Sequence, residues 1–158
     1  MNENFDRCMQ FVFLWEVGSA PNGGYHNDPR DPGGETKWGI SKRAHPQVDI
    51  ANLTREKASM IYYNEYWTPS HCQLHPWPWD LIVFDTAVNM GPSRANILFQ
   101  ENTDWREYLF GRINYYLNIS AKTRDKFLKG WIRRVMDLNR EARRIKPLTN
   151  TTRGVIFN

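Results

Sequence analysis

The chain has 158 residues and a mass of 18.7 kDa, with 41% hydrophobic and 24% charged residues, the composition of one ordinary globular domain. A chain of this length buries roughly 70% of the surface that it exposes when unfolded, which excludes the small scaffolds that depend on disulfides or metals. The longest apolar run covers residues 11–15 and is far shorter than the about 20 residues of a membrane-spanning helix, which excludes a transmembrane protein.

The net charge of +4 is distributed unevenly along the chain. Residues 1–102 carry 8 Lys and Arg against 12 Asp and Glu, whereas residues 103–158 carry 13 against 5. A basic second half favours an anionic partner such as nucleic acid, anionic lipid or a bacterial envelope, and a solvated helix face explains the same charges. The aromatic content of 14% is high for a mean hydropathy of -0.68 and indicates a sugar-binding surface.

The N-terminus indicates where the protein is made, whereas the two cysteines are uninformative about the compartment. Residues 1–7 lack the basic start and apolar stretch of a secretory signal, so we expect a protein that is made in the cytoplasm without an export signal. Cys8 and Cys72 need not pair in a domain of this size, and we expect free buried thiols. His71, Cys72 and His75 offer three ligands where structural zinc needs four, so we expect no metal and no cofactor.

The first third of the chain predicts one helix and a long loop. Apolar residues at spacings of three and four predict an amphipathic helix over residues 2–15, with Glu16 at its C-terminal end. Residues 18–46 hold 6 of the 10 glycines and 4 of the 9 prolines, which excludes a helix there. Tyr25 and residues 36–40 are the only short strand candidates, so we expect an irregular loop with one small β-hairpin.

The rest of the chain is predicted to be helical. Thr54 caps a helix that reaches Tyr66, and a second helix over residues 81–89 ends at Gly91. Three more helices are expected over residues 93–101, 104–117 and 126–145. On the last one, an apolar stripe of Phe127, Trp131, Val135 and Leu138 is flanked by basic residues that we place largely off the stripe, namely Arg133, Arg134, Arg140, Arg143 and Arg144. The predicted fold is therefore mainly α.

Glu16 is the candidate for general acid catalysis. Cleavage of a glycosidic bond needs a carboxyl group that retains its proton near neutral pH, which apolar surroundings favour. Trp15 and Val17 supply apolar neighbours, and the polar loop that follows holds Asp28, Asp31, Glu35 and Thr36 as partners. A glutamate at a helix end is usually an exposed surface residue, so spacing alone does not identify it as catalytic.

Long co-linear motifs change that balance. They comprise Trp15–Gly18, Gly23–Tyr25, Asn27–Thr36, Trp38–Ser41, Leu53–Thr54, Ile61–Tyr62, Tyr66–Trp67, Phe84–Gly91 and Phe127–Val135. In these stretches the chain resembles glycoside hydrolase family 108, the N-acetylmuramidases of bacteriophages and prophages within the lysozyme-like superfamily. The resemblance implies a lysozyme-like fold and hydrolysis of the β-1,4 bond between N-acetylmuramic acid and N-acetylglucosamine in peptidoglycan.

The resemblance also implies roles for individual residues. The family's catalytic glutamate falls on Glu16, which would protonate the leaving oxygen, and Thr36 is similar to the threonine that positions a water in phage lysozymes. Asp31 is the candidate for the second carboxylate and Asp28 is the alternative. Tyr25, Trp38 and Trp67 are candidates for stacking on sugar rings, although such aromatic residues often belong to a core. Asp85 and Asn89 lie four apart on one helical face and are expected to border the sugar cleft, unless Asp85 only braces the glycine loop.

Two departures from the family pattern bear on the domain. Residues 17–22 lengthen the loop between the catalytic glutamate and Gly23. Most of the peptidoglycan-binding segment that many relatives carry before the last helix is missing. We therefore expect a minimal catalytic domain over residues 1–158, with the family motifs in 1–100 and a helical part over 103–146.

The function that follows is that of an endolysin. We expect a monomer that acts on peptidoglycan after a holin opens the membrane, that does not bind nucleic acid, and whose basic last helix is attracted to the anionic envelope. The rival enzymes are a lytic transglycosylase and a chitinase-like glycosidase. The rival from another class is a glycan-binding module without catalysis, which would not need Glu16.

Overall fold

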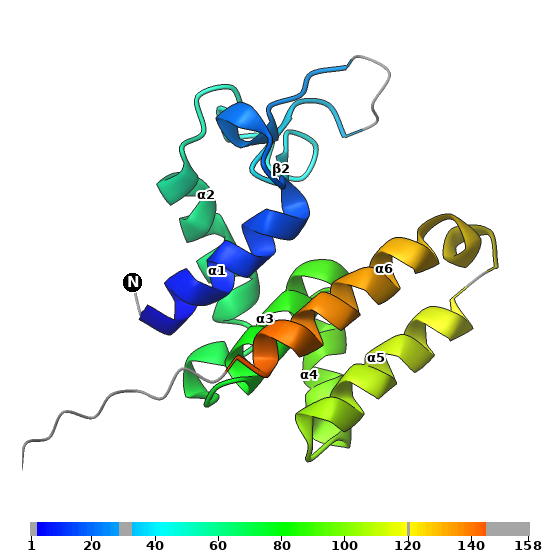
Figure 1. The fold of residues 1–158 in the computed structure, drawn as a ribbon. Coiled ribbons are helices and arrows are strands. Elements are labelled where there is room, and N and C mark those ends of the chain that lie inside the picture. The colour runs from blue at the N-terminus through cyan, green and yellow to red at the C-terminus, as the bar shows by residue number, and fades with distance from the viewer. Residues whose placement is uncertain (1–2, 29–32, 120, 145–158) are drawn as a thin grey trace, which may run out of the picture.

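The computed structural model describes residues 3–28, 33–119 and 121–144 (Figure 1). Within them, the chain forms six α-helices and one short hairpin, and the central helix, α3, is packed against four of the other five helices. No helix of this described part is long and apolar enough to cross a membrane. The helices are α1 Glu3–Glu16, α2 Arg55–Tyr62, α3 Trp79–Met90, α4 Pro92–Glu101, α5 Trp105–Asn118 and α6 Ala121–Ala142.

Helix α1 confirms the predicted N-terminal helix and buries its apolar stripe. Phe5, Cys8 and Val12 are inaccessible to solvent, and the helix ends at Glu16. Gly18 follows with a φ of +57°, a conformation that glycine adopts without strain. Cys8 and Cys72 are both free and buried, in agreement with the prediction from the sequence.

The predicted hairpin is present, with strands β1 (Thr36–Lys37) and β2 (Ile40–Ser41) paired antiparallel. Trp38 and Gly39 form the turn, with φ values of +55° and +77°. Two consecutive positive φ values belong to the two-residue turns that match the twist of a hairpin. The backbones of His26 and Thr36 also exchange two hydrogen bonds of 2.9 Å, which joins the first part of the loop to the hairpin.

Helix α2 begins as predicted, because the Thr54 side chain accepts a hydrogen bond from the backbone N–H of Lys57. The chain continues from α2 through a π-helical turn, Tyr63–Trp67. Trp67 is fully buried there and packs edge-on against Phe5 and Phe84, with ring centroids 5.2 Å apart in both pairs. The prediction that Trp67 stacks on a sugar is therefore wrong, because this ring belongs to the core.

Helix α3 is the centre of the fold and contacts α1, α4, α5 and α6. Every residue from Asp80 to Ala87 is buried, as expected of a helix that is covered on all sides. The polar side chains of a helix in that position need hydrogen-bond or ion-pair partners from the helices around it. Asp85 needs them most, because it carries a buried charge.

Helices α5 and α6 form an antiparallel pair, and α6 crosses α3 (Figure 1). Helix α6 starts at Ala121, five residues before the predicted start at 126. Its apolar stripe is buried at Val135 and Leu138, whereas Phe127 near the first turns is exposed. Four of the five arginines that we placed off the stripe are exposed, namely Arg133, Arg140, Arg143 and Arg144. The prediction is wrong for Arg134, which is buried and faces the core.

Candidate active site

Glu16 lies where α1 meets the hairpin. A Cβ atom placed on Gly39 would be 3.2 Å from the Cβ of Glu16, so the hairpin turn packs directly against this residue. The hydroxyl of Tyr62 donates a hydrogen bond of 3.1 Å to the carbonyl oxygen of Trp38 and holds the turn from the other side. Helix α1, the hairpin and α2 therefore define the position of Glu16 together.

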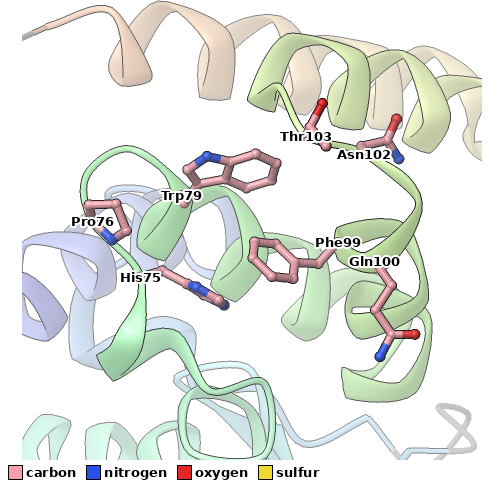
Figure 2. A pocket seen from close by; sticks show the side chains of 7 residues that line it. All are labelled: His75, Pro76, Trp79, Phe99, Gln100, Asn102 and Thr103. Atoms are coloured by element: carbon pink, nitrogen blue, oxygen red, sulfur yellow. The ribbon is translucent and has the colours of Figure 1, made fainter.

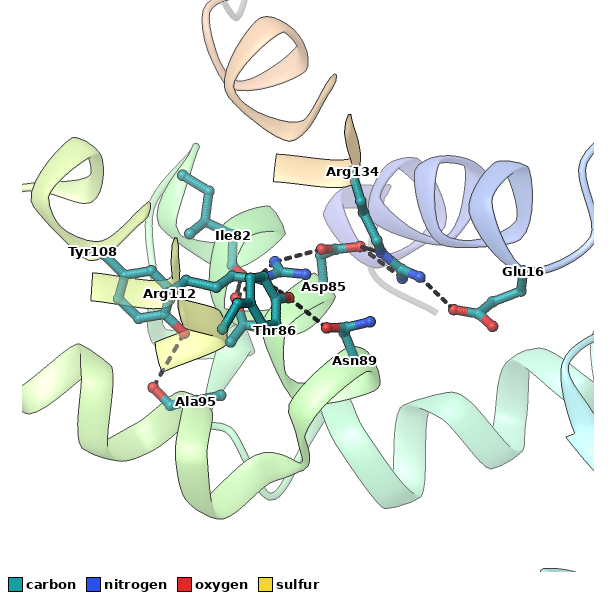
Figure 3. A network of polar contacts seen from close by, with 10 residues as sticks. Glu16, Ile82, Asp85, Thr86, Asn89, Ala95, Tyr108, Arg112 and Arg134 are labelled. Carbon is teal, nitrogen blue, oxygen red and sulfur yellow. Dashed lines mark hydrogen bonds and ion pairs between the residues drawn. The ribbon is translucent and has the colours of Figure 1, made fainter. Parts of the chain in front are cut away.

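A fourth element, α6, contributes the charge that faces Glu16. The Nη1 atom of Arg134 donates a hydrogen bond of 2.7 Å to Oε1 of Glu16 (Figure 3). The Glu16 side chain is 25% exposed, whereas that of Arg134 is 7% exposed. The carboxylate is thus held on its protein side and remains accessible from solvent.

Asp85 on α3 holds Arg134 in place. Its Oδ1 atom accepts a hydrogen bond of 2.9 Å from Nε of Arg134 and lies at ion-pair distance, 2.8 Å, from Nη2. Its Oδ2 atom accepts a hydrogen bond of 2.7 Å from Nη1 of Arg112 on α5. Burial alone raises the pKa of the Asp85 carboxyl, but the guanidinium groups of Arg134 and Arg112 outweigh burial and hold it below its ordinary value.

The Asp85 side chain is 0% exposed, so it does not border a sugar cleft in this structure. The prediction that it contacts substrate is corrected accordingly. It binds two buried arginines, one of which binds Glu16.

The second arginine leads to Asn89. Arg112 donates from Nε to the hydroxyl of Tyr116 over 2.7 Å, and the Tyr116 hydroxyl lies 2.5 Å from Oδ1 of Asn89. Nη1 of Arg112 also donates to the hydroxyl of Thr86 over 3.1 Å. Asp85 therefore connects, through two separate arginines, to both Glu16 and Asn89.

The aromatic candidates of the loop lie on the hairpin side. Tyr25 is 42% exposed, and its hydroxyl donates a hydrogen bond of 2.8 Å to Oε1 of Glu35. Trp38 is half-buried, and its ring packs on Phe13 with a centroid separation of 5.2 Å. Of these two rings, Tyr25 presents the larger surface to a ligand.

The structure describes only two of the three residues predicted to position or activate the water, Thr36 and Asp28. Thr36 lies in β1, and its hydroxyl donates a hydrogen bond of 3.4 Å to the carbonyl oxygen of Gly34. Asp28 is half-buried at the end of the described part of the loop. Asp31 lies outside the described residues.

Sequence reasoning missed three members of the site, Arg112, Tyr116 and Arg134. A signal existed for Arg134, because it follows Trp131 by three residues and precedes Leu138 by four, which places it on the apolar stripe. A charged residue on such a stripe requires a buried partner of opposite charge. Arg112 carried the same signal, since it follows Leu109 by three residues and precedes Tyr116 by four, whereas nothing in the sequence marked Tyr116 as a member of the site.

A separate pocket lies at the other end of α3. It has a volume of about 500 Å³ and is lined by His75, Pro76, Trp79, Phe99, Gln100, Asn102 and Thr103 (Figure 2). None of the residues predicted for the site lines it, and its lining provides no carboxylate. The pocket therefore offers no carboxyl group to act as the general acid.

Known proteins are similar to this chain over the region that contains the candidate site. The sequence model of the family described as glycosyl hydrolase 108 matches residues 10–91, which include Glu16, the hairpin, Asp85 and Asn89. The solved structure of Brucella abortus SagA superimposes with a TM-score of 0.68 at 25% identity, over 88% of this chain and 93% of that chain. No curated protein matches the chain. The expected fold, a mainly α lysozyme-like domain with a small hairpin, is confirmed.

Proposed function

Because the chain belongs to the glycosyl hydrolase 108 family and is thus a glycosidase of the peptidoglycan-degrading kind, we propose that it is an N-acetylmuramidase with Glu16 as its general acid. It hydrolyses the β-1,4 bond between N-acetylmuramic acid and N-acetylglucosamine. One observation carries this proposal: within the stretch that the family model matches, a partly exposed carboxyl group lies at the junction of α1, the hairpin and α6.

From the contact with Arg134 we infer different roles for the two oxygens of Glu16. Arg134 binds Oε1, so Oε2 is the oxygen that carries the proton to the glycosidic oxygen. In an inverting course, a water molecule attacks the anomeric carbon as the bond to the leaving sugar breaks, and its proton passes to a second carboxylate, Asp31 or Asp28. In a retaining course, that carboxylate attacks the anomeric carbon as the bond breaks, and a water molecule then hydrolyses the glycosyl-enzyme bond. The hydroxyl of Thr36, on the strand that leads into the turn beside Glu16, orients this water.

The distance between the two carboxyl groups decides the stereochemical outcome. Separations of about 6.5–9.5 Å leave room for a water and give inversion, whereas separations of about 5–5.5 Å give retention through a covalent intermediate. NMR spectroscopy of the newly formed anomer during the first turnovers distinguishes the two.

Digestion of purified peptidoglycan, with the fragments identified by mass spectrometry, tests the proposal. We expect reducing N-acetylmuramic acid ends from the wild type and none from Glu16→Gln. The matched control is Glu65→Gln, since Glu65 is exposed and pairs with His45, and it should retain activity. An active Glu16→Gln variant would sink the assignment of the acid.

The same digestion separates the rivals. Anhydro ends would identify a lytic transglycosylase, and cleavage of N-acetylglucosamine polymers in preference to peptidoglycan would identify a chitinase-like enzyme. Binding to peptidoglycan without release of any fragment would identify a glycan-binding module.

We extend the proposal to an endolysin that lyses the host after a holin opens the membrane. Cells that express the wild type in their cytoplasm should stay intact until the inner membrane is permeabilised, and their turbidity should then fall. Cells with Glu16→Gln should stay turbid throughout. Lysis on expression alone would contradict the dependence on membrane opening.

A further inference from the structure

Asn89 lies one turn beyond Asp85 on the same face of α3 and is half-buried. It belongs to the same network of polar contacts as Glu16, to which it is linked in turn through Tyr116, Arg112, Asp85 and Arg134 (Figure 3). Its Oδ1 atom is occupied by the Tyr116 hydroxyl. Whether Asn89 donates a hydrogen bond to a ligand or accepts one therefore depends on whether its amide nitrogen or its amide oxygen faces the ligand.

The hydrogen-bond donors of the network decide this. Arginine has only donors, so the contact of 2.7 Å between Nε of Arg112 and the Tyr116 hydroxyl uses the tyrosine oxygen as acceptor. The hydroxyl proton of Tyr116 is then directed to another acceptor. Its contact with Asn89 measures 2.5 Å, which suits an O–H to O hydrogen bond and is too short for an N–H to O bond. Tyr116 therefore donates to Oδ1 of Asn89, and the amide NH₂ group points away from Tyr116.

Tyr116 is held firmly enough to impose this orientation. Its side chain is buried, and its ring stacks on Trp131 with centroids 4.8 Å apart and planes inclined by 20°. Burial raises the pKa of Tyr116 despite the nearby Arg112, so the hydroxyl keeps its proton at neutral pH. Arg112 is itself fixed by its ion pair with the fully buried Asp85.

We propose that Asn89 binds substrate as a hydrogen-bond donor, to the carbonyl oxygen of an N-acetyl group, and that the buried Arg112 and Tyr116 set this orientation of its amide. The inference rests on the proposed function, because it assigns the recognised group to the sugar chain that the site cleaves. Asn89 is then a specificity residue, and Arg112 and Tyr116 are positioning residues.

An acetamido carbonyl fits a fixed donor better than the other groups of an amino sugar. Hydroxyl groups both donate and accept, so a fixed donor does not distinguish between them. A free 2-amino group lacks the carbonyl acceptor of the acetamido group, and in its ammonium form it has only donors, which would face the NH₂ group of Asn89 with no acceptor between them. The arrangement therefore selects N-acetylated sugars and rejects deacetylated ones.

Calorimetric binding of an N-acetylglucosamine hexamer and of its deacetylated form tests the inference without requiring catalysis. The wild type should bind the acetylated hexamer about tenfold more tightly or better, as expected for one hydrogen bond whose loss leaves a polar group unpaired. Asn89→Asp, which replaces the NH₂ group with an acceptor, should abolish or reverse the preference. Asn89→Ser should abolish it without adding a charge.

Two further variants separate the role of Tyr116 from general packing. Tyr116→Phe removes the hydroxyl that fixes the amide, so the acetyl preference should fall severalfold while affinity for the deacetylated form stays unchanged. Tyr115→Phe removes the same group from the preceding residue, which faces Arg94, and should leave both affinities unchanged. Circular dichroism verifies that each variant is folded.

The inference is overturned if the wild type does not prefer the acetylated hexamer, or if the Asn89 and Tyr116 variants keep its preference or weaken both ligands equally. Digestion of normal and N-deacetylated peptidoglycan separates this result from the proposed function. Failure to cleave either wall contradicts the muramidase, whereas cleavage of both at equal rates contradicts only the role of Asn89.

Discussion

Replacement of Asp85 by asparagine should destabilise the protein strongly. The carboxylate is fully buried and binds two guanidinium groups, at 2.7 Å for Arg112 and 2.8 Å for Arg134, and both arginines are buried as well. Asparagine has almost the same shape but no charge, so the variant leaves Arg112 without a counter-ion and Arg134 with only Glu16. Removal of one partner from a buried ion pair costs about 3–5 kcal/mol.

Because both arginines share one carboxylate, their losses do not add. We therefore expect the free energy of unfolding to fall by about 3–5 kcal/mol, a large part of the roughly 5–15 kcal/mol that a domain has in total. At about 2–4 °C per kcal/mol for a chain of this size, Tm should fall by about 6–20 °C. Urea unfolding at pH 7 and thermal melting, both followed by circular dichroism, measure the two quantities.

Asp137→Asn is the matched control. It removes an exposed carboxylate that lies 2.6 Å from Nη1 of Arg140, and exposed pairs contribute only about 0–1 kcal/mol. A loss below about 1 kcal/mol for Asp85→Asn would refute the reasoning, because the buried network would then contribute no more than a surface pair.

The pH dependence provides a second readout for Asp85. Its pKa is lower in the folded protein than in the unfolded chain, so its contribution is present above the ordinary carboxyl pKa of about 3.9. That contribution is lost as the pH falls through the folded value. The Asp85→Asn variant should therefore lose less stability than the wild type between neutral and acidic pH.

Three other predictions concern single residues. Burial raises the pKa of Asp80 to about 6, above its value in the unfolded chain, so the folded state loses about 3 kcal/mol of stability as the pH rises from about 4 to about 6. Urea titrations should show this slope in the wild type and not in Asp80→Asn. Gly39→Ala would place a carbon 2.3 Å from the Tyr62 hydroxyl, at a residue whose φ is +77°. The substitution should lower the free energy of unfolding by about 1–3 kcal/mol and displace the hairpin from Glu16. Unchanged melting and activity would contradict the packing described. Arg134→Gln should lower kcat on peptidoglycan by about 100-fold, because the acid is misplaced. Arg133→Gln, on the exposed face of α6, should change kcat less than about twofold. Equal losses of kcat in the two variants would mean that both arginines act only through the overall positive charge.

The helices and the hairpin were predictable because their signals are local. Periodic apolar residues, the Thr54 cap and the glycines of the loop act within a few positions of one another. The start of α6 was placed too late because its first turns, with an exposed Phe127, contribute little to the apolar stripe on which the prediction relied.

The site was predictable only in part. Glu16 followed from its place at the end of an apolar helix together with the family motifs, and Asn89 followed from the motif around it. Trp67 was misassigned because a tryptophan that stacks on a sugar and one that packs in a core look alike in a sequence. Asp85 was misassigned because its burial depends on arginines that are contributed by other helices.

The sequence by itself determined the secondary structure, the family and the position of the candidate acid, since each depends on residues close together in the chain. Only the tertiary structure decided how that acid is held. The contacts of Asp85 with Arg112 and Arg134 join residues 27 and 49 positions apart, and that of Glu16 with Arg134 joins residues 118 positions apart. A buried carboxylate requires nearby cations, but the sequence does not show which arginines supply them. Packing of α5 and α6 around α3 makes that choice, because it brings the two guanidinium groups to opposite oxygens of one buried side chain.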